Sequence, residues 1–122
     1  MRDIATEKSK VFAVKIIKLY KAICLEKREY VLTKQLLKAG TSIGANLAEA
    51  EFAFSKKDYV SKKSIALKEC AETLYWLELL NETEFLDHEL FSILKAECKE
   101  ILKLLLSTIK TMRNEDKITN IK

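Results

Sequence analysis

Few residues in this sequence have the types and spacing that catalysis or metal binding requires. The one histidine, His88, follows Asp87, which we expect to cap a helix on a solvated turn, so no base is placed beside a nucleophile. Glu69 and Glu72 are spaced to share a helix face, but a di-iron bundle also needs Glu-x-x-His pairs, and the sequence has none. Helical carboxylates such as Glu49 are more typical of salt bridges and interfaces. We therefore expect a protein that is not an enzyme, with no catalytic residue, metal site or cofactor.

A glycine-rich phosphate loop is also missing. The two glycines, Gly40 and Gly44, fall inside a helical pattern, without the strand, the lysine or the spacing of a P-loop. With Ala48 they form a line of small residues at every fourth position, on which another helix can lie close. Two glycines inside a helix cost about 2 kcal/mol relative to alanine, so close packing or a function should offset them. Packing inside the protein is the simpler interpretation, and assembly with another chain is the alternative.

A group of lysines is the main candidate for contact with nucleic acid. It consists of Lys56, Lys57, Lys62, Lys63 and Lys68. Nearby acidic residues dilute this charge, and a solvated helix face is the simpler interpretation. Lys63 also falls on the apolar stripe of its helix, so we expect it to reach solvent along its stem or to pair with an acid.

The elements that position these residues are helices. The 122 residues include no proline and only two glycines, so turn signals are scarce. Apolar residues recur at spacings of three and four, most strictly along Leu32, Leu36, Ala39, Ile43, Leu47, Ala50 and Phe54. We predict helices over residues 4–28, 31–54, 56–81 and 88–112, and a frayed tail over 113–122. Short connections favour antiparallel neighbours, so residues 1–122 should form one all-α domain, an up-down-up-down antiparallel four-helix bundle.

Charge, cysteines and hydropathy narrow the class of protein. The net charge of +4 is mild, so nucleic-acid binding is permitted but not required. Cys24, Cys70 and Cys98 lie far apart among apolar neighbours, which favours reduced thiols. We find neither a signal peptide nor an uncharged apolar run of the ~20 residues that a membrane span needs. We therefore expect a cytoplasmic protein with no membrane contact.

The apolar surface exceeds what one bundle core can bury. On the helix expected over 56–81, Ile65 and Trp76 lie off the core stripe, in line with Glu69 and Glu72, and Tyr75 is adjacent. The last helix has an equally wide apolar face, with Leu102, Leu106 and Ile109. We therefore expect the protein to self-associate and bury this extra apolar surface between copies.

A polar strip lies beside the small-residue line of the second helix. It consists of Ser42, Asn46 and Glu49. If any part of this strip is buried, its polar groups need hydrogen-bond partners, and the third helix offers candidates.

Three segments carry a specific resemblance. They are AGTSIGANLAEA at 39–50, SKKDY at 55–59 and IALKECAETLYWL at 65–77. They resemble the bacterial four-helix bundle proteins related to the protein encoded by intervening sequences of 23S rRNA genes. The positions that match the recurrent motif are Ser42, Ile43, Asn46, Glu49, Ser55, Glu69, Glu72 and Trp76. Lys63 departs from the family, whose members often have an apolar residue there.

The resemblance implies an up-down-up-down bundle that assembles into a ring-like homopentamer. A relative in diversity-generating retroelements is an accessory factor that binds a reverse transcriptase and nucleic acid. In this family the motif positions serve structure and assembly rather than catalysis, and we add Gly44 to the predicted assembly residues.

Two functional hypotheses remain. The first is a non-enzymatic, homo-oligomeric bundle that scaffolds RNA or a ribonucleoprotein partner, with lysines making sequence-independent phosphate contacts. Assembly would multiply the modest charge of one subunit. The alternative is a protein–protein interaction module with no nucleic-acid role. Only RNA binding through lysines should weaken steeply with added salt.

Overall fold

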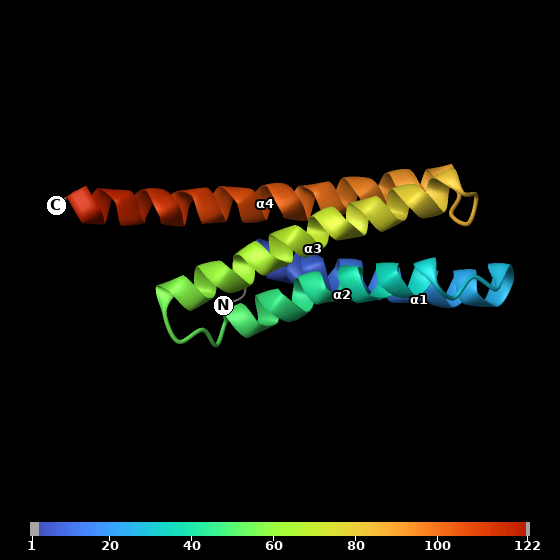
Figure 1. Cartoon of the computed structure of the whole chain (residues 1–122), viewed down its shortest axis with the longest axis horizontal. Helices are drawn as coiled ribbons and strands as arrows, with labels where there is room; N and C mark the ends of the chain where they lie inside the picture. The colour runs from blue at the N-terminus through green and yellow to red at the C-terminus, as the bar shows by residue number, and fades with distance from the viewer. Residues whose placement is uncertain (1–2, 122) are drawn as a thin grey trace.

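The protein is an antiparallel bundle of four helices (Figure 1). The computed structural model describes the backbone of residues 3–121 and the side chains of residues 3–115. The helices are α1 (Ile4–Lys27), α2 (Leu32–Ala50), α3 (Lys56–Glu82) and α4 (His88–Ile121). Each packs against the next, α4 also packs against α1, and α1 and α3 are diagonal, as are α2 and α4. The predicted all-α, up-down-up-down architecture is confirmed.

Each helix buries one stripe of apolar side chains in a common core. The stripes predicted for the first and last helices are buried along nearly their whole length, from Phe12 to Ile23 and from Phe91 to Leu105. The largest fully buried apolar side chains are Phe12, Ile16, Leu36, Ile43, Leu47, Leu77, Leu80, Leu94, Ile101 and Leu105. Burying one such side chain contributes about 1.5–3 kcal/mol, which is why this stripe pattern determines the fold.

The small-residue line of α2 is used inside the bundle. A Cβ atom at Gly40 would lie 3.0 Å from both Cγ atoms of Ile16, and one at Gly44 would lie 3.2 Å from Oγ of Ser9. Both neighbours belong to α1, so the glycines allow α1 and α2 to pack closely. This placement supports the simpler interpretation of the line and leaves Gly44 covered by α1.

Side-chain caps begin the helices. Oγ of Ser55 accepts a hydrogen bond from N of Asp58 at 3.0 Å, and Oδ1 of Asp87 accepts one from N of Leu90 at 2.9 Å. Both caps were predicted from the sequence, and each satisfies an amide that the helix leaves unpaired. Asp3 caps α1 in the same way, through N of Thr6.

The second helix is shorter than predicted. It ends at Ala50 rather than at residue 54, and residues 51–55 form the turn to α3. Phe54 was placed on the buried seam, but it is 99% exposed. The physical reason is that Ser55 caps α3, so the chain must reverse before it, and the last helical residues expected for α2 are needed for that reversal.

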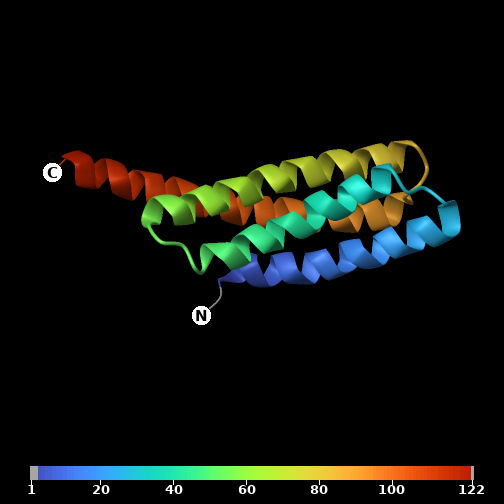
Figure 2. The same cartoon turned by 60° about the horizontal axis from the view of Figure 1, so that its bottom comes forward.

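The last helix is longer than predicted. Its backbone is helical to Ile121, whereas we expected a helix end at residue 112 and a frayed tail; Lys122 lies outside the described residues. Figures 1 and 2 show the end of α4 projecting beyond the turn between α2 and α3. No glycine or proline interrupts this segment, so nothing local ends the helix earlier.

Candidate interaction surfaces

Glu49, Glu69, Glu72 and Trp76, which were predicted for assembly, lie on α2 and α3, whereas Gly44, predicted with them, packs against α1. An ion pair between Nζ of Lys62 and Oε2 of Glu49, at 3.7 Å, connects α3 to α2. We define the acidic–apolar face as Glu49 on α2 together with Ile65, Glu69, Glu72, Tyr75 and Trp76 on α3. Ile65 and Tyr75 are 39% and 54% exposed, so this face leaves large apolar groups in contact with water.

Ser42 and Asn46 of the polar strip do not use the candidate partners that α3 offers. Oγ of Ser42 donates to O of Lys38 at 2.6 Å, and Nδ2 of Asn46 donates to O of Ser42 at 2.8 Å. The partners are therefore carbonyl groups of α2 itself and not side chains of α3. Hydroxyl and amide side chains inside helices commonly bond back to the preceding turn in this way. Only Glu49 of this strip pairs with α3, through Lys62.

Two carboxylates of the acidic–apolar face are close enough to affect each other. Burial raises the pKa of Glu69, and the negative charge of Glu72 raises it further. The ionised form of Glu69 is therefore disfavoured in the isolated chain. A positive group placed against this face would relieve that cost.

Trp76 has an unsatisfied donor. Its Nε1 atom is buried, and it has no hydrogen-bond acceptor among the described residues. The ring meets Tyr75 edge-on, with centroids 5.2 Å apart and an angle of 70° between the planes. An unpaired buried donor costs about 1–3 kcal/mol, so the indole N–H of Trp76 is a locally unfavourable group of the fold.

Lys63 forms an ion pair with Asp3, which is one of the two alternatives expected from the sequence. Its side chain is 2% exposed, and its Nζ lies 2.5 Å from Oδ2 of Asp3 and 5.0 Å from the centre of the Tyr59 ring. Burial favours the neutral lysine, but hydrogen bonds to Asp3 and Tyr59 outweigh this effect and raise the pKa of Lys63. An ammonium held in this way is not placed to contact a phosphate, which argues against a nucleic-acid role for this lysine.

The other four predicted lysines do not form a single patch. Lys62 turns toward α2, where it pairs with Glu49, and Lys56 turns toward α4, where it lies 3.4 Å from Glu115. Lys57 and Lys68 are exposed on the outside of α3. A phosphate contact through these four residues stays a prediction.

The outer side of α1 is a surface that sequence reasoning missed. Val11, Val14 and Ile17 are exposed at a spacing of three residues, which places them on one side of the helix. Three exposed lysines border them, Lys10, Lys18 and Lys21. We call these six residues the basic–apolar face. Their spacing was the available signal, but the stronger core stripe of the same helix obscured it.

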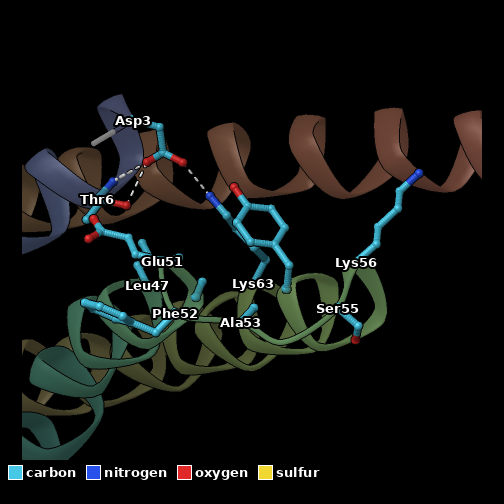
Figure 3. A pocket seen from close by; sticks show the side chains of 11 residues that line it. Asp3, Thr6, Leu47, Glu51, Phe52, Ala53, Ser55, Lys56 and Lys63 are labelled. Atoms are coloured by element: carbon cyan, nitrogen blue, oxygen red, sulfur yellow. Dashed lines mark hydrogen bonds and ion pairs between the residues drawn. The ribbon is translucent and has the colours of Figure 1, made fainter. Parts of the chain in front are cut away.

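The turn between α2 and α3 is the second missed surface. It borders a groove of ≈ 790 Å³, drawn in Figure 3, whose floor contains the pair Asp3–Lys63 and whose rim contains Phe52 and Lys56. Phe52 is 80% exposed, and Phe54 is 99% exposed. The cap signal at Ser55 already implied a turn here.

The remaining candidates for chemistry are ordinary structural groups. His88 is exposed at the start of α4, and its ring lies 6.0 Å from that of Phe91. Cys70 and Cys98 are buried, and Sγ of Cys98 donates to O of Cys70 at 3.5 Å. Among the described residues, no three His, Cys, Asp or Glu side chains cluster as metal ligands, and no helix is long and apolar enough to cross a membrane.

Comparison with known proteins agrees with this architecture. The model of the 23S rRNA-intervening sequence protein family matches residues 3–107. A crystal structure of a protein of unknown function from the S23 ribosomal protein family of Bacteroides thetaiotaomicron is 50% identical and superposes with a TM-score of 0.86, over 88% of this chain and 99% of that one. No match to a curated protein was found. The chain belongs to the family of 23S rRNA-intervening sequence proteins.

Proposed function

We propose that the protein is a non-enzymatic, cytoplasmic scaffold that assembles with copies of itself, and that the assembled form associates with RNA or a ribonucleoprotein. The observation that carries the assembly is the presence of two complementary surfaces on one chain. The acidic–apolar face has carboxylates around Ile65, Tyr75 and Trp76, and the basic–apolar face has lysines around Val11, Val14 and Ile17. Opposite charges around apolar centres give an interface both affinity and orientation.

The position of the two faces determines the kind of assembly. They lie on α3 and α1, which are diagonal in the bundle, so they point away from each other and cannot meet within one chain. A contact between the acidic–apolar face of one copy and the basic–apolar face of the next is head-to-tail, and such contacts close into rings when the rotation allows it. A ring of five, which the family resemblance implies, is our expectation.

The same contact would relieve an unfavourable feature of the isolated chain. A lysine of the neighbouring copy would offset the repulsion between Glu69 and Glu72. This gain depends on assembly, because the described part of the chain places no cation in an ion pair with either carboxylate.

The proposal that the protein associates with RNA depends on its net positive charge and on the family to which it belongs. The net charge of +4 becomes several times larger in an oligomer, and phosphate contacts act together when they are linked. The family description names a protein encoded within 23S rRNA genes, which makes RNA the first partner to test.

A charge-swap experiment tests the assembly. Solution mass from light scattering should fall to that of the monomer when Glu69 and Glu72 are both changed to lysine, since like charges across an interface cost several kcal/mol. The same loss is expected for Lys18→Glu with Lys21→Glu. An equimolar mixture of the two variants should form complexes again. Each variant alone has two faces of the same charge, basic in the glutamate-to-lysine variant and acidic in the lysine-to-glutamate variant, and only a contact between the two variants brings opposite charges together.

The matched control reverses two acids outside both faces, Glu84 and Glu89, which are exposed on either side of the start of α4. This control should retain the mass of the unmodified protein. If the unmodified protein is itself a monomer at all concentrations, or if the Glu69 and Glu72 reversal leaves its mass unchanged, the proposed assembly is wrong.

A protein-interaction module without an RNA role is the second candidate. It is favoured by the lysines: one is buried against Asp3 and two lie against carboxylates. RNA binding separates the two functions. Binding that weakens as salt is added supports the scaffold, and absence of binding at low salt supports the module.

A further inference from the structure

The turn between α2 and α3 exposes two aromatic rings. Phe52 and Phe54 are 80% and 99% exposed, although phenylalanine is among the residues that proteins most often bury. They stand two positions apart in a short turn at the end of the bundle. Large apolar groups concentrated at one exposed place indicate a binding surface.

The turn is held in place by hydrogen bonds. Oδ2 of Asp58 accepts from N of Phe54 at 3.1 Å, while N of Asp58 donates to Oγ of Ser55 at 3.0 Å. N of Phe52 donates to O of Glu49 at 3.0 Å. The backbone that carries both rings is thus organised before any ligand arrives, which lowers the entropic cost of binding.

A cationic cleft lies next to the rings. Lys56, Lys57 and Arg113 line it with Val60, in a space of ≈ 440 Å³ between the start of α3 and the projecting part of α4. Lys56 also lines the groove that Phe52 borders, so this lysine is shared by the two spaces, and Figure 3 shows its side chain directed away from the ring of Phe52.

Three acids lie near this cleft: Glu115, Asp58 and, in the adjoining groove beside Phe52, Glu51. Glu115 lies 3.4 Å from Lys56, but both side chains are largely exposed, and such surface pairs contribute little. A phosphate can replace this carboxylate as the partner of Lys56. The Asp58 carboxylate accepts from the backbone of the turn.

The charge of the molecule is distributed unevenly along its long axis. Between Lys68 and Lys95 the sequence has seven acidic residues and no lysine or arginine. This stretch forms the second half of α3 and the start of α4, whose connecting turn lies at the end of the bundle opposite the phenylalanines (Figure 1). The α1–α2 connection lies at the same end and carries Lys27, Arg28 and Lys34, so the acidic stretch makes the surface of α3 and its turn negative without giving that whole end a negative charge.

We propose that this end of the bundle binds single-stranded RNA, with unpaired bases stacked on Phe52 and Phe54 and phosphates held by Lys56, Lys57 and Arg113. The inference rests on the RNA role proposed above, and it adds the site and the form of the RNA. Aromatic faces beside cations are the usual means of binding a single strand without sequence preference, because every base has a face to stack. Bases inside an RNA duplex are already stacked and do not offer that face.

The test uses the full chain and two labelled probes, a short oligouridine and an RNA duplex of the same length, with affinity measured by fluorescence anisotropy. The unmodified protein should prefer the single strand. The double variant Phe52→Ser with Phe54→Ser should bind it at least ~5-fold more weakly, which is the lower limit for loss of one stacked base. Its dependence on salt should be unchanged, since no phosphate contact is removed.

Two further variants make the test specific. Lys57→Gln with Arg113→Gln should weaken binding of the single strand and also reduce its dependence on salt. Leu25→Ser with Val31→Ser is the matched control, because both residues are exposed and apolar at the opposite end of the bundle, and it should leave binding unchanged. The solution mass of each variant, measured by light scattering, shows whether the substitutions also change its assembly.

The outcomes separate this inference from the proposed function. If the unmodified protein binds neither probe at low salt, the RNA role and this site are both wrong. If it binds the single strand but the phenylalanine variant binds equally well, only this site is wrong. A phenylalanine variant that binds RNA normally but has a lower mass would place the rings between copies of the chain, which also overturns the inference.

Discussion

The ion pair between Asp3 and Lys63 gives the sharpest prediction about stability. It joins the residue before α1 to the start of α3, with Nζ of Lys63 2.5 Å from Oδ2 of Asp3. Changing Asp3 to asparagine removes the charge that compensates the ammonium of a lysine side chain that is 2% exposed. Breaking a fully buried pair costs ~3–5 kcal/mol. The Asp3 side chain is 45% exposed, so water compensates in part, and we expect a loss of about 2–3 kcal/mol in the free energy of unfolding.

A double-mutant cycle isolates the pair. Lys63→Met keeps most of the volume of the lysine stem and removes the charge, so it should cost about 1 kcal/mol or less. The double variant should be close to Lys63→Met alone, because the asparagine then faces no buried charge. Urea unfolding followed by circular dichroism measures all three variants. A cost for Asp3→Asn of less than about 0.5 kcal/mol would refute the reasoning, since it would mean that Lys63 gains an equivalent partner or reaches water.

The same pair predicts a dependence on pH. Burial favours the neutral form of Asp3, but hydrogen bonds from Lys63 and Thr6 outweigh it and lower the pKa of Asp3. The stabilisation is therefore present above the unfolded pKa of ~3.9 and is lost as the pH falls through the lower folded value. The difference in stability between the unmodified protein and Asp3→Asn should shrink on acidification below about pH 4.

Three further predictions concern single positions. Gly40→Ala should destabilise the protein by ~1 kcal/mol, because crowding of the stiff Ile16 side chain exceeds the gain in helix propensity. Gly44→Ala should be nearly neutral, since the nearest neighbour of the added methyl group is the Ser9 hydroxyl. Thermal unfolding should therefore give a lower midpoint for Gly40→Ala than for Gly44→Ala. Ser55→Ala should cost about 1 kcal/mol through loss of the α3 cap, measured by urea unfolding, and an unchanged midpoint would contradict the role of this hydrogen bond. Glu69→Gln should stabilise the monomeric chain by up to ~0.5 kcal/mol at neutral pH, because the raised pKa of Glu69 means that its ionised form is disfavoured on folding, and the same change should weaken assembly in light scattering.

Local patterns in the sequence determined the helices, their order and their caps. The core stripe from Phe12 to Ile23 repeats with the helical period, and any helix with such a stripe must bury it. The caps at Ser55 and Asp87 depend on residues three positions apart, which are in contact whatever the rest of the chain does. The family resemblance also lies in local segments of α2 and α3, so it was readable without a structure.

Contacts between distant segments were decided only by the tertiary structure. Lys63 showed an anomaly in the sequence, but its partner Asp3 is sixty positions away, and no spacing rule connects them. Phe54 continued the apolar period of α2, yet the reversal into α3 placed it in solvent. The period of a helix predicts which side is buried, but the packing of the other helices decides where that helix ends and which groups stay on the surface.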